Sequence, residues 1–143
     1  MTKDFRALRQ LAEKMNLFET NFYFFAFHFL SIVFMDLIAM IIIYYSGYNN
    51  WFTYTIAVLL LVTSQAQAGW LQHDFGHLSV FKSNKMNHIF HRIVIGTIKG
   101  VSADWWNYRH FQHHAKPNTV KKDPDIRFGS LLVLGKIIPR EVI

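Results

Sequence analysis

Cysteine is absent from this chain of 143 residues, and proline is scarce, with three occurrences. Without thiols the chain can form no disulfide scaffold, thiolate zinc site, iron–sulfur centre or cysteine nucleophile. A metal would have to be bound by histidine or carboxylate side chains, and the sequence contains eight histidines. The length suits one domain or part of a larger one.

Charge is scarce in the middle of the chain. Residues 22–71 contain a single charged residue, Asp36, whereas residues 72–143 contain eleven basic and five acidic residues. Residues 1–21 are nearly balanced, with four basic and three acidic side chains. The net charge of +6 therefore follows an almost uncharged stretch, which favours loops facing anionic lipid over a nucleic-acid surface.

The uncharged stretch is apolar enough to cross a bilayer twice. Residues 22–45 would form a helix of about 36 Å, against roughly 30 Å of hydrocarbon core. Residues 51–71 form a second apolar run, and the short connector between the runs favours antiparallel neighbours. We predict an all-α membrane protein with a transmembrane hairpin followed by cytosolic or interfacial helices, and we favour this over a soluble bundle.

Basic residues on both sides of the hairpin place residues 1–21 and 72–143 in the cytosol by the positive-inside rule. Aromatic residues would form a belt at each membrane face: Tyr44, Tyr45, Tyr48 and Trp51 on the far side and Trp70 on the cytosolic side. Within the spans, we expect His28 and Asp36 to make interhelical hydrogen bonds or to meet a cavity. The apolar tail, residues 128–143, is too short for a third span.

Residues 84–100 are predicted to form one amphipathic helix along the membrane surface. Its apolar face would consist of Met86, Ile89, Phe90, Ile93 and Val94, and its polar face of Lys85, His88, Arg92 and Lys99. His88 lies among the cations, which favours an interfacial polar role over metal binding. His91 lies near the boundary and stays unassigned.

Two histidine clusters follow the second span. His73 and His77 share a helix face at i and i+4, and His110, His113 and His114 share another at i, i+3 and i+4. Pro117 should end the second helix. Neutral imidazoles suit zinc, copper, iron or nickel, and five of them exceed what one tetrahedral zinc needs, which favours a pair of redox metals.

Other side chains near these clusters could support such a site. Asn107 lies on the stripe of the second cluster, and Asp74 follows His73 at about 100°, so we expect both to orient ligands rather than to bind directly. Four basic residues, Arg109, Lys116, Lys121 and Lys122, also lie next to or shortly after the second cluster.

These motifs are similar to those of a known family. His73-Asp74-Phe75-Gly76-His77 and His110-Phe111-Gln112-His113-His114 resemble the first and second histidine boxes, HDxGH and HxxHH, of membrane fatty acid desaturases, in particular the front-end acyl-CoA desaturases. The flanks Trp105-Trp106-Asn107-Tyr108-Arg109 and Ala115-Lys116-Pro117-Asn118 also match. The likeness extends from Asp4 to Asp125.

The resemblance implies an enzyme of the endoplasmic reticulum membrane that introduces a cis double bond into an acyl-CoA or other acyl lipid. The five box histidines would bind two iron ions that use O₂, with electrons from cytochrome b5 and its NADH-dependent reductase. The arginine and lysines named above would bind coenzyme A phosphates.

The resemblance covers the first half of a desaturase domain. Neither the family's third box, QxxHH, nor its haem-binding HPGG motif occurs in these residues. We therefore expect the chain by itself to carry an incomplete set of iron ligands. A related histidine-box lipid hydroxylase and a truncated, non-catalytic or regulatory desaturase-like protein are the alternatives, with a metal transporter ranked last.

Overall fold

The fold was analysed in a computed structural model, which describes residues 2–47, 49–119 and 121–126. The regular secondary structure of the described part is entirely helical, and that part contains no strand. Its elements are α1 (Lys3–Lys14), α2 (Phe22–Ser46), α3 (Trp51–Gly76), α4 (Asn84–His91), η1 (Arg92–Ile98), α5 (Ala103–Ala115) and η2 (Pro124–Ile126). The predicted all-α architecture is confirmed.

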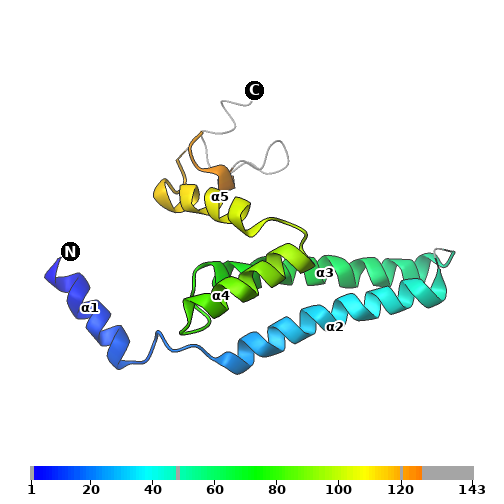
Figure 1. Ribbon diagram of the computed structural model, residues 1–143, viewed down its shortest axis with the longest axis horizontal. Coiled ribbons are helices and arrows are strands. Elements are labelled where there is room, and N and C mark those ends of the chain that lie inside the picture. Colours follow the sequence, from blue (N-terminus) through cyan, green and yellow to red (C-terminus); the bar gives the residue numbers. More distant parts are fainter. Residues whose placement is uncertain (1, 48, 120, 127–143) are drawn as a thin grey trace.

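Helices α2 and α3 form a long antiparallel hairpin, with the connector at one end and the other helices toward the opposite end (Figure 1). Each begins at an asparagine cap: Asn21 accepts a hydrogen bond from the amide of Phe24, and Asn50 accepts from Phe52 and Thr53. Such caps satisfy amides that have no partner within a helix.

Both hairpin helices are long and apolar enough to cross a membrane, as predicted. Only 11% of the most apolar window of α2 and 22% of that of α3 is buried, whereas the core helix of a soluble protein would be mostly enclosed. Tyr44, Tyr45 and Trp51 are exposed at one end of the hairpin and Trp70 is exposed in the other half of α3; the predicted aromatic belts stay a prediction. Tyr48 and residues 128–143 lie outside the described residues.

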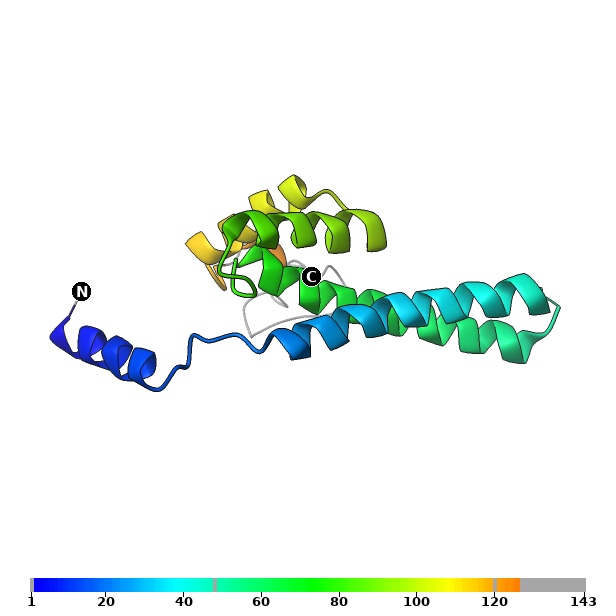
Figure 2. The ribbon, with the colours of Figure 1, turned by 60° about the horizontal axis from the view of Figure 1, so that its bottom comes forward.

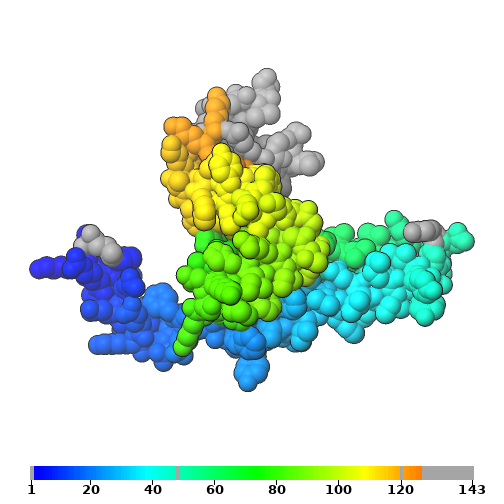
Figure 3. Space-filling view, in the orientation of Figure 1, coloured from blue at the N-terminus to red at the C-terminus, as the bar shows by residue number. Residues whose placement is uncertain are grey.

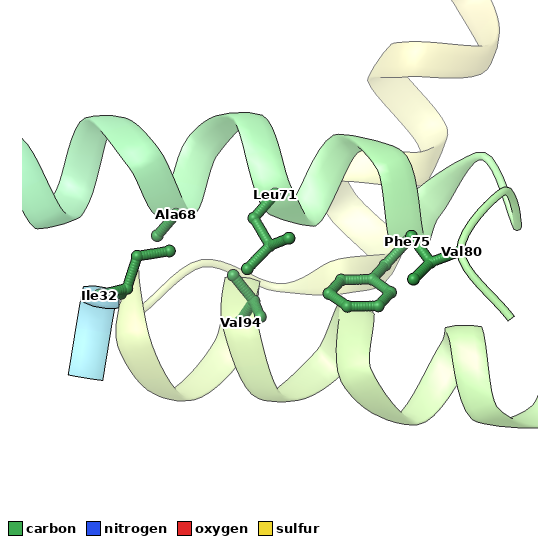
Figure 4. Packing of buried hydrophobic residues seen from close by; sticks show 6 residues of the cluster. All are labelled: Ile32, Ala68, Leu71, Phe75, Val80 and Val94. Atoms are coloured by element: carbon green, nitrogen blue, oxygen red, sulfur yellow. The ribbon is translucent and has the colours of Figure 1, made fainter. Parts of the chain in front are cut away.

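The hydrophobic core lies where α4 and η1 pack against the second half of α3. Figure 4 shows its buried members, which are Ile32, Ala68, Leu71, Phe75, Val80 and Val94. In the rotated view, α4 and α5 lie together over one side of this end of the hairpin (Figure 2). This packing fixes the end of α3 that carries the first histidine cluster.

The segment predicted as one amphipathic helix is helical, but its buried face differs from the prediction. Asn87, His91, Val94 and Ile95 are buried, whereas Met86, Ile89 and Ile93 stay partly exposed. The reason is twofold. After His91 the helix widens into the π-helical turn η1, whose larger repeat rotates the later residues. In addition, hydrogen bonds satisfy Asn87 and His91 in the interior, so polarity did not indicate exposure.

Polar side chains connect the hairpin internally. The ring of His28 is hydrogen bonded to Gln67 at 2.8 Å, which confirms the expected interhelical contact. Asp36 differs: its Oδ1 atom is buried without a hydrogen-bond partner among the described residues. Gln65 donates to the carbonyl of Ile98, and Lys99 donates to the carbonyl of Gln65, so the polar second half of α3 is used to hold η1.

Candidate metal centre

The two histidine clusters are carried by helix ends that local sequence determines. His73 lies in the last turn of α3, and His77 is the residue that ends that helix. Helix α5 begins where the Ser102 hydroxyl accepts from the amide of Trp105 and ends at Ala115, two residues before Pro117 as predicted. The other three imidazoles therefore lie in the last two turns of α5.

Three imidazoles from these two helix ends converge on one point. The Nε2 atoms of His77 and His110 are 3.0 Å apart, those of His110 and His114 are 3.0 Å apart, and those of His77 and His114 are 3.2 Å apart. First-row metals bind imidazole nitrogen at about 2.1 Å, so two such donors at right angles lie about 3.0 Å apart. The triangle matches the spacing of three ligands around one cation.

Hydrogen bonds alone cannot account for this triangle. Each Nε2 atom carries either a hydrogen or a lone pair, so each is either a donor or an acceptor. Three mutually contacting atoms cannot all be paired as donor with acceptor. At least one of the three contacts must join two donors or two acceptors. A single cation would accept all three lone pairs, and these residues therefore fit a metal.

Burial and the neighbouring imidazoles favour the neutral form of two rings in the cluster, those of His77 and His110. Burial, followed by the charges of His73 and His114, lowers the pKa of His77. Burial also lowers the pKa of His110, partly offset by its hydrogen bond to Asp125. His73 completes the group, with its ring centroid 4.4 Å from that of His77 and 4.8 Å from that of His110. Neutral rings keep the lone pairs that a metal needs.

His113 faces a different set of partners. Its Nδ1 atom is 2.9 Å from Asp123 Oδ2, and Asp123 is fully buried. Asp123 also accepts from the amides of Asn118 and Asp125, which folds the loop after α5 back onto that helix. Although burial works to raise the pKa of Asp123, these amides and His113 lower it below its ordinary value. The predicted set of five therefore divides into a cluster of four and a flanking His113.

Two carboxylates at the site were not predicted from sequence. Asp123 is hydrogen bonded to His113, and Asp125 lies 3.3 Å from Nδ1 of His110. A carboxylate on Nδ1 holds the hydrogen there and leaves the Nε2 lone pair for a metal. His113, Asp123 and Asp125 also present ligand atoms within 4.8 Å of one another. Asp123 and Asp125 follow directly after Lys121 and Lys122, which was a visible signal, but only loop closure brings the two carboxylates to the histidines.

A tryptophan that was also not predicted as a site residue covers the cluster. The ring of Trp106 stacks on His110 with centroids 4.2 Å apart and contacts His91 at 5.1 Å. A Cβ atom on Gly76 would lie 2.5 Å from the Trp106 ring, so only glycine permits this approach. His91, left unassigned above, is buried and bonded to Gln72 at 2.9 Å.

The other predicted residues lie around the centre. Asp74 Oδ1 lies 3.6 Å from His73 Nδ1, which is longer than a hydrogen bond, so the orienting role expected for Asp74 stays a prediction. Asn107 lines a cavity of about 510 Å³ together with His88, His91 and Arg92.

The cationic residues lie at and beyond the end of α5. Arg109 donates to the Pro124 carbonyl at 2.7 Å and therefore holds the loop. Lys116, Lys121 and Lys122 are exposed on that loop.

Comparisons with known proteins add to this geometry. The family model described as "Fatty acid desaturase" matches residues 49–135. The chain is also 48% identical over 139 residues to the mouse (Mus musculus) "Fatty acid desaturase 2-like protein FADS2B", an alignment that covers 97% of this chain. It covers 28% of that relative, so the chain spans little more than a quarter of its length. No solved structure matches.

Proposed function

Because this chain belongs to the fatty acid desaturase family, we propose that it forms the first part of an acyl desaturase. The proposed iron ligands are His73, His77, His110, His113 and His114. The triangle of Nε2 atoms is the observation that carries this proposal, since hydrogen bonding leaves it unsatisfied and one cation satisfies it.

Iron, when bound, would supply the oxidising chemistry that removes two hydrogens from the acyl chain. O₂ would be reduced to two waters, with two electrons and two protons making up the balance, and the proposed electron donor is cytochrome b5 with its NADH-dependent reductase. The chain's own residues hold and cover the site. Asp123 and Asp125 fix hydrogens on His113 and His110, and Trp106 shields one ring face of His110 from water.

The hairpin would place this centre where an acyl chain can reach it from the lipid. We propose that the segments before and after the hairpin both face the cytosol, and that the hairpin spans the endoplasmic reticulum membrane. An acyl-CoA would then meet Lys116, Lys121 and Lys122 beside the helix end. Arg109 would act by holding the loop that carries these lysines, because its guanidinium already binds the Pro124 carbonyl.

The test is iron content in variants of the cluster. We expect His77→Ala and His114→Ala to weaken iron binding by more than the roughly 10- to 100-fold that loss of an outer partner costs. His88→Ala is the matched control, because His88 is exposed on α4 outside the triangle. Iron per chain is measured by mass spectrometry after anaerobic loading with Fe(II) in detergent. Equal iron in all three variants would overturn the proposal.

Lipid analysis separates the desaturase from its closest alternative. When the chain is expressed as part of the complete protein, a desaturase yields a product with a new double bond. A related hydroxylase yields a new hydroxyl group instead, and a regulatory protein yields neither. The same His77→Ala change should abolish product, whereas His88→Ala should not.

A further inference from the structure

Helix α1 presents one apolar face that nothing in the described part of the chain covers. At 100° per residue, most of its apolar side chains fall within an arc of about 120°. These are Phe5, Leu8, Leu11 and Ala12, with Met15 directly after the helix; Ala7 lies about 40° outside this arc, and Asp4, in the first turn, lies within it. The opposite side carries Lys3, Arg6, Gln10, Glu13 and Lys14.

The exposure of this face is unusual for a folded helix. Leu8 is 63% exposed and Met15 is 59% exposed, and α1 has no buried residue. A hollow of about 450 Å³ on the same face is lined by Phe5, Leu8, Ala12 and Phe18. Isolated helices of this length are marginal in water, so α1 needs a partner for its apolar face.

The position of α1 restricts what that partner can be. Figures 1 and 3 show α1 beside the hairpin end opposite the connector, where α2 begins. Residues 15–21 join the two helices and, at about 3.5 Å per residue, reach no more than roughly 25 Å. The linker carries two exposed apolar side chains, Leu17 and Phe18, and it continues into the exposed Phe22 of α2. Helix α1 is therefore tethered close to the surface of the bilayer that α2 enters.

The charge of α1 fits the same partner. The helix carries four basic and two acidic side chains, and one acidic group, that of Glu13, is paired with Arg9 at 3.0 Å. Basic side chains beside an apolar face are typical of helices that lie in the headgroup layer of anionic membranes.

We propose that α1 lies flat in the headgroup layer of this bilayer, with Phe5, Leu8, Leu11 and Met15 toward the acyl chains. The basic side chains then face the headgroups, and anionic lipid strengthens the contact. This surface would hold the N-terminal segment against the membrane. The proposal depends on the membrane hairpin and is independent of iron.

The test uses the absence of cysteine, which lets a single introduced thiol report its surroundings. Leu8→Cys places a fluorophore such as NBD on the apolar face, and Gln10→Cys places it about 200° away on the polar face. The full chain is reconstituted in phosphatidylcholine vesicles with or without phosphatidylserine. Quenching is measured with nitroxide-labelled lipid and, separately, with aqueous iodide.

We expect lipid nitroxide to quench the label at residue 8 at least twofold more than the label at residue 10, and iodide to show the reverse order. Equal quenching at both sites would place α1 in water and overturn the proposal. A label at residue 8 shielded from iodide yet unquenched by lipid would indicate a protein partner, which also overturns it.

A second pair of measurements tests the role of charge. Arg6→Gln combined with Lys14→Gln should reduce lipid quenching of the label at residue 8 in phosphatidylserine vesicles and leave it nearly unchanged in pure phosphatidylcholine. Both side chains are exposed, so the change should not affect packing. If this double change leaves the difference in quenching between phosphatidylserine and phosphatidylcholine vesicles unaltered, the proposed contact with anionic headgroups is contradicted.

Discussion

At the residue scale, the polar side chains of this site work through specific partners. His91 is hydrogen bonded to Gln72 in the interior, and Gln72 in turn donates to the carbonyl of Gly69. Because the amide oxygen of Gln72 accepts from His91, the bond requires a hydrogen on Nε2 and is compatible with a neutral ring. Burial, followed by the charges of His88 and Arg92, lowers the pKa of His91 to about 4.

This shift predicts a pH dependence of stability. Between about pH 4 and 6.5 the unfolded chain protonates His91 while the folded chain does not, so the unfolded state binds more protons. The stability that the neutral His91 contributes is fully present above pH 6.5 and is lost as pH falls toward 4. We expect His91→Gln, whose amide can still donate to Gln72, to lose less stability over this window than the unmodified chain.

The measurement is thermal unfolding in detergent, followed by tryptophan fluorescence at several pH values from 4 to 7.5. His88→Gln is the comparison variant: it removes one of the charges that lower the pKa of His91 but leaves His91 buried, so most of the pH dependence should stay in place. If the unfolding temperatures of the unmodified chain and of His91→Gln fall in parallel with pH, His91 is not the source of the pH dependence.

At the element scale, the glycines of α3 show how closely α5 approaches that helix. Gly69 and Gly76 both lie within α3, but their surroundings differ. A Cβ on Gly69 would meet the Lys99 Nζ atom at 3.6 Å, an ordinary contact, whereas a Cβ on Gly76 would lie 2.5 Å from Trp106. The close approach of α5 to α3 therefore depends on Gly76 and not on Gly69.

Gly76→Ala should accordingly displace Trp106 from His110. We expect a loss of about 1–3 kcal/mol in unfolding free energy, typical of overpacking, together with weaker iron binding. Gly69→Ala should be neutral or more stable by up to about 1 kcal/mol, because alanine favours the helix. Denaturant unfolding and iron content are measured for both. If Gly76→Ala binds iron as tightly as Gly69→Ala, Trp106 does not organise the centre.

At the scale of the whole molecule, the hairpin sets which side of the membrane each part faces. The connector and the metal centre lie at opposite ends of α2 and α3 (Figure 1). If both helices cross the bilayer, residues 49 and 82 must face opposite compartments. The basic residues around the centre favour the cytosol for residue 82.

Single cysteines test this topology in sealed microsomes. A membrane-impermeant maleimide should label Lys82→Cys in intact vesicles and label Asn49→Cys only after the membrane is permeabilised. The unmodified chain, which has no cysteine, gives the background. Labelling of both sites before permeabilisation would contradict a hairpin that spans the membrane.

The sequence by itself determined the features that depend on neighbours along the chain. Length and hydropathy predicted two helices that can span a membrane, and Pro117 predicted the end of α5. The i, i+4 spacing placed His73 with His77, because the helical repeat relates residues over a single turn. The residue types predicted metal-ligand chemistry.

Only the tertiary structure decided which side chains meet across elements. It brought His77 from α3 to His110 and His114 from α5, and it turned His113 toward Asp123. It also buried two polar residues of α4, Asn87 and His91, while His88 stayed exposed. The physical reason is that periodicity gives a side chain its direction around its own helix, whereas distances between helices depend on packing volume and loop closure over the whole molecule.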